Sequence, residues 1–207
     1  MLPTILSREQ ARVLELLSQE KGCSSFYLAG GTGLALRLGH RRSEDFDFFS
    51  ASAFENLVWK EKLNRLAPIA VLQDSSGTLT VEIESVRTSL FHYSYPLLES
   101  PEPTPWGFGI ASNADIGAMK LAAVASRGSK RDFFDLFALC SGPLPFAALL
   151  EAFHKKFAGV RFDEYHLLRS LAYFEDAEGE PDLRMVLPIS WEQVKQFFRT
   201  LVVKRLE

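Results

Sequence analysis

The chain has 207 residues, of which 47% are hydrophobic and 24% charged, so it is long enough to bury a core and too apolar for a disordered protein. A formal net charge of −3 gives no overall basic character that would indicate nucleic-acid binding, although a local basic patch stays open. Cys23 and Cys140 lie far apart without a metal-ligand spacing, which excludes the usual patterns of a disulfide framework or zinc site. The sequence shows no signal-peptide pattern and no apolar run near the roughly 18 residues of a membrane span, so a cytoplasmic protein is expected.

The N-terminal half is expected to alternate helices with short strands. Ser7 and Gln10 form a capping-box pattern that predicts a helix ending near Gly22. The apolar residues 26–29 predict a buried strand that runs into a tight Gly-Gly turn. The elements expected next are a short helix at 32–38 that ends at Gly39, a strand at 45–49, a helix at 53–66, a strand at 69–72, and two strands within 79–95 that turn near Glu84 and Ser85.

The C-terminal half is expected to be helical. Residues 100–109 hold three prolines and two glycines, which predicts a connection between a sheet and a helical part. Helices are then expected from Asn113 to about 127, from Ser129 to about 140, from Pro145, within 163–175, and from Ser190. Strands early and helices late favour an α+β fold, with residues 1–100 as the sheet-bearing core and 101–207 as a helical region packed on it in a single compact unit.

Two aspartates on the strand at 45–49 are the first candidates for chemistry. Side chains on a strand repeat every two residues, so Asp45 and Asp47 point to the same side. Two carboxylates on one strand face suit a magnesium ion, which takes one or two carboxylates together with phosphate oxygens. A solvated strand end, where acidic residues are ordinary, is an equally good explanation of this pair alone.

The turn at Gly30, Gly31 and Thr32 is the second candidate. Two glycines let the backbone approach a ligand closely, and the start of a helix offers free N–H groups and the positive end of a dipole to phosphate oxygens. Thr32 is expected to cap that helix or to donate to a phosphate. In isolation, an ordinary strand-to-helix turn would be the better explanation of these glycines.

A basic segment downstream is the third candidate. Lys120 and Arg127 are seven residues apart on one helix face, and Arg127, Lys130 and Arg131 form a cluster suited to the phosphates of a nucleotide or an RNA. In the competing interpretation, Asp132 caps its helix and pairs with a nearby arginine, while the ammonium group of Lys120 extends into solvent.

Two segments carry a resemblance to a known family. Residues 27–32 with 43–49, and later 115–120 with 127–136, resemble the AbiEii/AbiGii toxin family of minimal nucleotidyltransferases, within the nucleotidyltransferase superfamily. The resemblance implies a mixed sheet flanked by helices and an enzyme that transfers a nucleoside monophosphate from an NTP to an RNA, such as a tRNA, or to a protein. It also implies a toxin-like member of a type IV toxin–antitoxin or phage-defence system, with a possible cognate antitoxin.

The resemblance also implies roles for individual residues. Gly30, Gly31 and Thr32 would hold the triphosphate, and Asp45 and Asp47 would bind Mg²⁺ or Mn²⁺. Downstream, Lys120 would contact phosphate and Asp132 would support catalysis, with Lys130 and Asp135 as second choices.

One departure from the pattern bears on activity. Nucleotidyltransferases usually bring a third carboxylate from a later strand, but the expected strand at 86–91 carries serine and threonine. Glu82 or Glu84 on the neighbouring strand is the alternative source, with the register left open. The sequence therefore also allows a catalytically weak or inactive nucleotide- or partner-binding module, or an unrelated α+β scaffold.

Overall fold

The structure is a computed structural model that describes residues 5–206. Its helices are α1 (Arg8–Leu17), η1 (a 3₁₀ helix, Lys21–Ser25), α2 (Gly30–Leu38), α3 (Asn56–Leu66), α4 (Asn113–Arg127), α5 (Lys130–Cys140), α6 (Phe146–Lys156), α7 (Glu164–Ser170), α8 (Glu175–Glu178) and α9 (Trp191–Leu206). Its strands are β1 (Tyr27–Leu28), β2 (Phe46–Ser50), β3 (Ile69–Ser75), β4 (Thr78–Ile83), β5 (Val86–His92), β6 (Glu102–Pro103) and β7 (Gly109–Ile110). Across residues 5–206, no helix is both long enough and apolar enough to cross a membrane.

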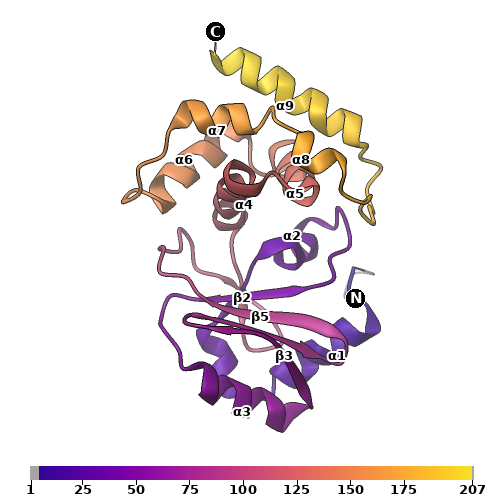
Figure 1. Ribbon diagram of the computed structural model, residues 1–207, viewed down its shortest axis with the longest axis vertical. Helices are drawn as coiled ribbons and strands as arrows, with labels where there is room; N and C mark the ends of the chain where they lie inside the picture. The colour runs from indigo at the N-terminus through magenta and orange to yellow at the C-terminus, as the bar shows by residue number, and fades with distance from the viewer. Residues whose placement is uncertain (1–4, 207) are drawn as a thin grey trace.

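The strands form a mixed sheet between two groups of helices. Its order is β3-β4-β5-β2-β1-β7-β6, with β2 parallel to β5 and antiparallel to β1. Figure 1 shows α1 and α3 in the half of the molecule that holds the sheet, α4 to α9 in the other half, and α2 between the two. Helix α2 packs on β2 and also contacts α4 and α5. The predicted α+β fold is confirmed.

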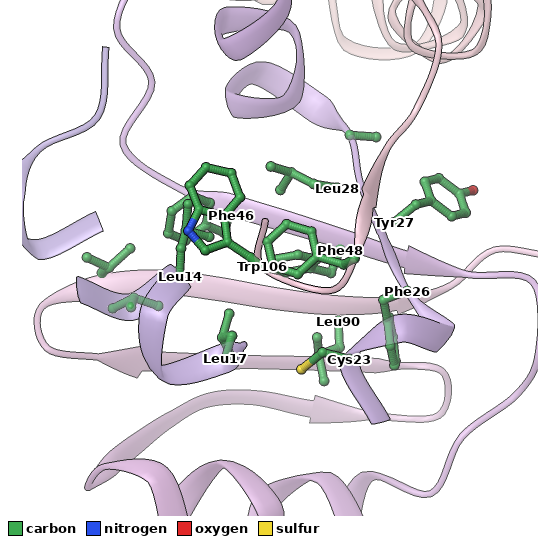
Figure 2. Close-up of a cluster of buried hydrophobic side chains, with 14 of the residues drawn as sticks. Leu14, Leu17, Cys23, Phe26, Tyr27, Leu28, Phe46, Phe48, Leu90 and Trp106 are labelled. Carbon is green, nitrogen blue, oxygen red and sulfur yellow. The ribbon is translucent and has the colours of Figure 1, made fainter. Parts of the chain in front are cut away.

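A first hydrophobic core fills one face of the sheet. Phe46 and Phe48 alternate with the half-buried Asp47 along β2, so a strand with period two presents aromatic rings to one side and a carboxylate to the other. Figure 2 shows Leu14 and Leu17 of α1 in the same cluster. Burial of such side chains contributes about 1.5–3 kcal/mol each.

A second hydrophobic core lies among the later helices. It contains Phe133 of α5, Phe153 of α6 and Phe198 of α9, all fully buried. Helix α4 contributes to both cores, because Ile116 packs in the first and Ala118 in the second. The division of the chain at residue 100 stays a prediction.

Several local predictions are confirmed. Ser7 and Gln10 form a complete capping box at α1, and Ser190 and Gln193 exchange the same pair of hydrogen bonds ahead of α9. The hairpin between β4 and β5 turns at Glu84 and Ser85, which have φ values of 49° and 62°. Two successive positive φ angles match the twist of a two-residue hairpin.

Other local predictions are wrong in detail. The Gly-Gly pair does not precede α2 but forms its first turn, since the amide of Gly33 donates to the carbonyl of Ala29. The expected connection at 100–109 adds two short strands, and Pro103 is tolerated there because β6 lies at the sheet edge.

Three helix starts and ends among α4 to α8 also differ from the prediction. Ser112, not Asn113, caps α4. The hydroxyl of Ser129 donates to Glu180 instead of capping α5. The helix expected within 163–175 is α7 and ends at Ser170, because the chain leaves the helical path in tight turns there, and α8 begins at Glu175.

Candidate active site

A cavity of about 790 Å³ lies between the open face of β2 and β5 and the helix α4. The first turn of α2 and the segment 41–45 close one side of the cavity, and the segment 180–184 closes another. The residues that line it include Gly30, Gly31, Arg41, Asp45, Asp47, Phe49, Arg87, Ser89, Met119, Lys120, Arg127, Arg131 and Glu180. The sheet, helix α2 and the later helices α4 and α5 therefore meet at this cavity.

Asp45 and Asp47 both line the cavity, as strand periodicity predicts. Within residues 5–206, neither carboxylate forms an ion pair or accepts a hydrogen bond. Burial raises the pKa of Asp47, Lys120 lowers it, and the neighbouring charge of Asp45 raises it further. Two unpaired carboxylates at one cavity are a donor set that suits a divalent cation.

The first turn of α2 lies against Asp47. Gly30 has a φ of 61°, and a Cβ atom built on it would come within 2.5 Å of Oδ2 of Asp47. A Cβ atom on Gly31 would come within 2.6 Å of Nη2 of Arg41. Both glycines are therefore required for this close approach, and the N-terminal end of α2 faces the cavity.

Thr32 lies elsewhere than the sequence predicts for a phosphate-binding residue. Its side chain is 1% exposed and does not line the cavity. Its hydroxyl donates to the backbone carbonyl of Asp45 and so fixes the chain just before β2. The sequence could not predict this contact of the Thr32 hydroxyl, because the carbonyl that accepts it belongs to a separate segment of the chain.

Lys120 lies in the cavity wall and is buried, whereas the competing interpretation of the sequence has its ammonium group in solvent. Its Nζ atom is 2.7 Å from Oδ1 of Asp132 and 2.6 Å from Oδ2 of Asp135, and the residue is 6% exposed. Arg127 donates to the other oxygen of Asp132 at 2.9 Å. Burial alone would raise the pKa of Asp132, but Lys120 and Arg127 hold it below its ordinary value.

Asp132 and Lys130 do not line the cavity. Asp132 is fully buried behind Lys120 and Arg127. It accepts hydrogen bonds from these two cavity-lining side chains and does not itself reach the cavity. Lys130 is 4% exposed, and its Nζ donates to the carbonyl of Glu180 at 2.5 Å. Lys130 therefore holds the segment 180–184 against α5, whereas the sequence predicts a phosphate contact.

His40 and Arg41, which the sequence did not indicate as site residues, form a neighbouring buried cluster with Asp135. Asp135 accepts from Nε2 of His40 at 2.7 Å and from Nε and Nη2 of Arg41 at 2.6 and 2.8 Å. Burial alone would raise the pKa of Asp135, but Lys120 and Arg41 hold it well below its ordinary value. In a polar loop such as 40–44, nothing in the sequence indicates which charged side chain is buried.

The expected third carboxylate does not lie at the cavity. Ser89 is the β5 residue opposite Asp47, and its hydroxyl lies 3.1 Å from that of Thr80. Glu82 lies opposite Arg87 one strand further away, and Glu84 lies in the hairpin turn. Over the part of the chain that the structure describes, no three histidine, cysteine or acidic side chains cluster as a metal site.

Comparisons with known proteins identify the family of the chain. The family model described as nucleotidyl transferase AbiEii toxin, type IV TA system, matches residues 12–103 and 69–204. An uncharacterized protein of Aquifex aeolicus (strain VF5), aq_aa25, is 38% identical over 206 residues, which covers 98% of each chain.

Solved structures share the fold. MenT4, a nucleotidyltransferase toxin from Mycobacterium tuberculosis H37Rv, aligns with a TM-score of 0.63 at 20% identity, over 96% of this chain and 82% of that one. JHP933 from Helicobacter pylori aligns with a TM-score of 0.56 at 18% identity, over 96% and 90%. The two-part family match and the extended sequence identity show that the chain belongs to the AbiEii family of nucleotidyltransferase toxins from type IV toxin–antitoxin systems.

Proposed function

We propose that the protein transfers a nucleoside monophosphate from an NTP to a hydroxyl group of an RNA, such as a tRNA, or of a protein. The observation that supports this most is the meeting of the Asp45 and Asp47 carboxylates with the first turn of α2 and several cations at one cavity. Family membership implies the NTP substrate and an antitoxin partner. A role in defence against phage belongs to the same proposal.

The triphosphate would lie between the first turn of α2 and the cations of α4 and α5. Gly30 and Gly31 let the side chains of Asp47 and Arg41 lie against the N-terminus of α2, where backbone N–H groups would donate to phosphate oxygens. Lys120, Arg127 and Arg131 line the same cavity and would offset the negative charge. Asp132, which touches Lys120 and Arg127, would act by positioning them, and Thr32 by fixing Asp45.

Asp45 and Asp47 would hold Mg²⁺ or Mn²⁺. They fit such an ion because both carboxylates face the cavity and neither has an ion-pair partner among residues 5–206. When bound, the ion would polarise the α-phosphate and favour ionisation of an attacking hydroxyl. Burial and Asp45 raise the pKa of Asp47, and a nearby cation would lower that pKa by favouring the ionised form.

The reaction balances as a displacement at phosphorus. The acceptor oxygen forms a bond to the α-phosphorus, the bond to the β-phosphate oxygen breaks, and pyrophosphate leaves with its charge. The acceptor loses a proton to water or to a basic group at the cavity. The cations of α4 and α5 would stabilise the charge that accumulates on the departing pyrophosphate.

A label-transfer assay tests the proposal. The purified protein is incubated with each α-labelled NTP, Mg²⁺ or Mn²⁺, and either total RNA or cell lysate. We expect label in a nuclease-sensitive or a protease-sensitive product, and loss of that label in the double variant Asp45→Ala with Asp47→Ala. Asp176→Ala, an exposed aspartate far along the chain, is the matched control and keeps transfer.

A second candidate rests on Ser89, a neutral residue where a third carboxylate is usual. A protein that binds NTP in calorimetry, transfers no label with any acceptor, and gains no transfer from Ser89→Asp would be a nucleotide- or partner-binding module. That outcome would overturn the proposed transfer reaction while leaving the fold and the family unchanged.

A further inference from the structure

Asp135 joins two cavity cations and a histidine at one buried carboxylate. Its oxygens accept from His40, twice from Arg41, and from Lys120, all within 2.8 Å. Asp135 and His40 are fully buried, and Arg41 is 4% exposed. Burying such ion pairs has a desolvation cost that can exceed their mutual attraction, so their presence is weak evidence of a role in stability.

The donors of Arg41 are only partly used. A guanidinium group has five N–H donors. Two go to Asp135, and one of Nη1 goes to the backbone carbonyl of Arg42 at 3.0 Å. Two donors remain on a group that lines the cavity and lies beside Gly31, where a Cβ atom would be 2.6 Å from Nη2.

The charges around this group favour an anion. Arg41, Lys120 and Arg127 share the two carboxylates of Asp132 and Asp135, so the cluster holds three cations and two anions. One positive charge is therefore not compensated within the cluster, which adjoins the same cavity as the carboxylates of Asp45 and Asp47. The helix N-terminus adds to this potential.

We propose that Arg41 binds a phosphate of the NTP directly, and that Asp135, together with His40, is the positioning residue that fixes its guanidinium group beside the first turn of α2. This inference rests on the proposed function, because it assumes that the triphosphate lies at that turn. His40 acts through Asp135: its Nε2 donates to the carboxylate, while its Nδ1 is buried without a partner among the described residues. The ionised carboxylate needs an N–H donor, so Nε2 of His40 carries a hydrogen that points to Asp135.

Calorimetric titration with inorganic tripolyphosphate and Mg²⁺ tests this assignment without requiring turnover. We expect Arg41→Gln to weaken tripolyphosphate and NTP binding roughly 10- to 100-fold, the loss expected for a charged hydrogen-bond pair. Arg41→Lys keeps the charge but cannot make the same paired contacts with Asp135, so its binding should lie in between. Arg12→Gln, which removes an exposed charge from α1, is the control and binds normally.

The positioning role is tested by coupling. Asp135→Asn should weaken tripolyphosphate binding in the wild-type background and have little further effect when Arg41 is already Gln, since both act through one contact. If Asp135→Asn does not fold, His40 serves instead: His40→Ala should weaken binding, and His40→Gln, which keeps a side-chain N–H donor, should restore it.

The outcomes separate the two proposals. A wild-type protein that binds neither tripolyphosphate nor any NTP overturns the proposed function. A wild-type protein that binds both, with Arg41→Gln and Arg41→Lys binding equally well, overturns only the role of Arg41. Fully additive losses in the Asp135→Asn and Arg41→Gln double variant, or no difference between His40→Ala and His40→Gln, overturn the positioning role.

Discussion

Ser89 of β5 lies directly opposite Asp47 of β2 in the parallel ladder that joins the two strands. Both residues line the cavity, and the hydroxyl of Ser89 lies 3.1 Å from the hydroxyl of Thr80 on β4. The row across these three strands therefore runs from a carboxylate to two neutral hydroxyls. Among residues 5–206, the carboxylates that line this cavity from β2 and from the position just before it are those of Asp47 and Asp45.

Ser89→Asp is expected to tighten divalent-metal binding. A third carboxylate beside Asp47 adds a charged ligand, and ligand charge strongly tunes the affinity of oxygen-ligand sites. We expect roughly tenfold tighter Mn²⁺ binding, equivalent to about 1.4 kcal/mol, together with a lower Tm in the absence of metal because three carboxylates repel one another. Calorimetry and thermal unfolding with and without Mn²⁺ measure both effects.

Ser89→Asn is the control for that substitution, because asparagine has nearly the same size as aspartate but carries no charge. It should lose the contact with Thr80 as Ser89→Asp does, but should not tighten Mn²⁺ binding. Equal Mn²⁺ affinities for the two variants would show that residue 89 lies outside the metal site.

Asp47→Asn is expected to stabilise the protein while removing its activity. Burial and Asp45 raise the folded-state pKa of Asp47 above its ordinary value near 3.8. The folded state therefore binds a proton at Asp47 more tightly than the unfolded state does. The stability that this proton contributes is fully present below pH 3.8 and is lost as the pH rises through the raised pKa. At pH 7 the ionised carboxylate lowers stability, so the neutral variant should have a higher Tm, by about 2–4 °C for each 1 kcal/mol gained.

Thermal unfolding at pH 7 and pH 3 measures the effect of Asp47→Asn. The gain in Tm should shrink at pH 3, where the wild-type carboxyl is protonated, and Asp176→Asn on the surface should change little at either pH. A variant that is less stable than wild type at pH 7 would contradict the assigned cause of the raised pKa.

Gly30→Ala is expected to damage both stability and activity. The residue has a φ of 61°, a conformation that costs an L-residue roughly 1–2 kcal/mol, and the new Cβ atom would come within 2.5 Å of the Asp47 carboxylate. Gly128→Ala is a matched control, because Gly128 has a φ of 57° but its nearest neighbour would be 3.9 Å away.

Urea unfolding and the label-transfer assay compare the two glycine variants. Gly128→Ala should lose stability alone, whereas Gly30→Ala should lose more stability and most of its transfer activity, because Asp47 must move. Equal activity in the two variants would contradict the close approach of α2 to Asp47.

Asp135→Asn is expected to destabilise the protein at neutral pH and much less in acid. The folded-state pKa of Asp135 is well below its ordinary value of 3.8, because Lys120 and Arg41 outweigh the effect of burial. Its stabilising contribution is therefore present above pH 3.8 and is lost as the pH falls below that value toward the folded-state pKa. Breaking a buried ion pair costs about 3–5 kcal/mol.

Urea unfolding at pH 7, 5 and 3 checks this expectation. The difference in the free energy of unfolding between wild type and Asp135→Asn should be similar at pH 7 and pH 5 and should be smaller at pH 3. Asp163→Asn, which changes an exposed aspartate that caps α7, is the control, and asparagine keeps that capping role. A gap that stays constant across the three pH values would contradict the ion-pair origin of the stabilisation.

Local patterns in the sequence predicted most of the elements. The capping boxes at Ser7 and Ser190 and the turn at Glu84 and Ser85 depend on residues within a few positions of one another. The shared direction of Asp45 and Asp47 depends only on the period of a strand. Such features are set by backbone geometry and nearby hydrogen bonds, so they can be read without knowing the fold. The roles of these two aspartates and of the other site residues stay predictions.

Tertiary structure alone decided the surroundings of the two carboxylates. The register that places Ser89 opposite Asp47 depends on pairing between strands joined by a helix and two further strands. The hydrogen bonds from His40 and Arg41 to Asp135 join residues 95 and 94 positions apart. Burial and pairing of charges depend on which distant segments come together, and no local periodicity in the chain carries that information.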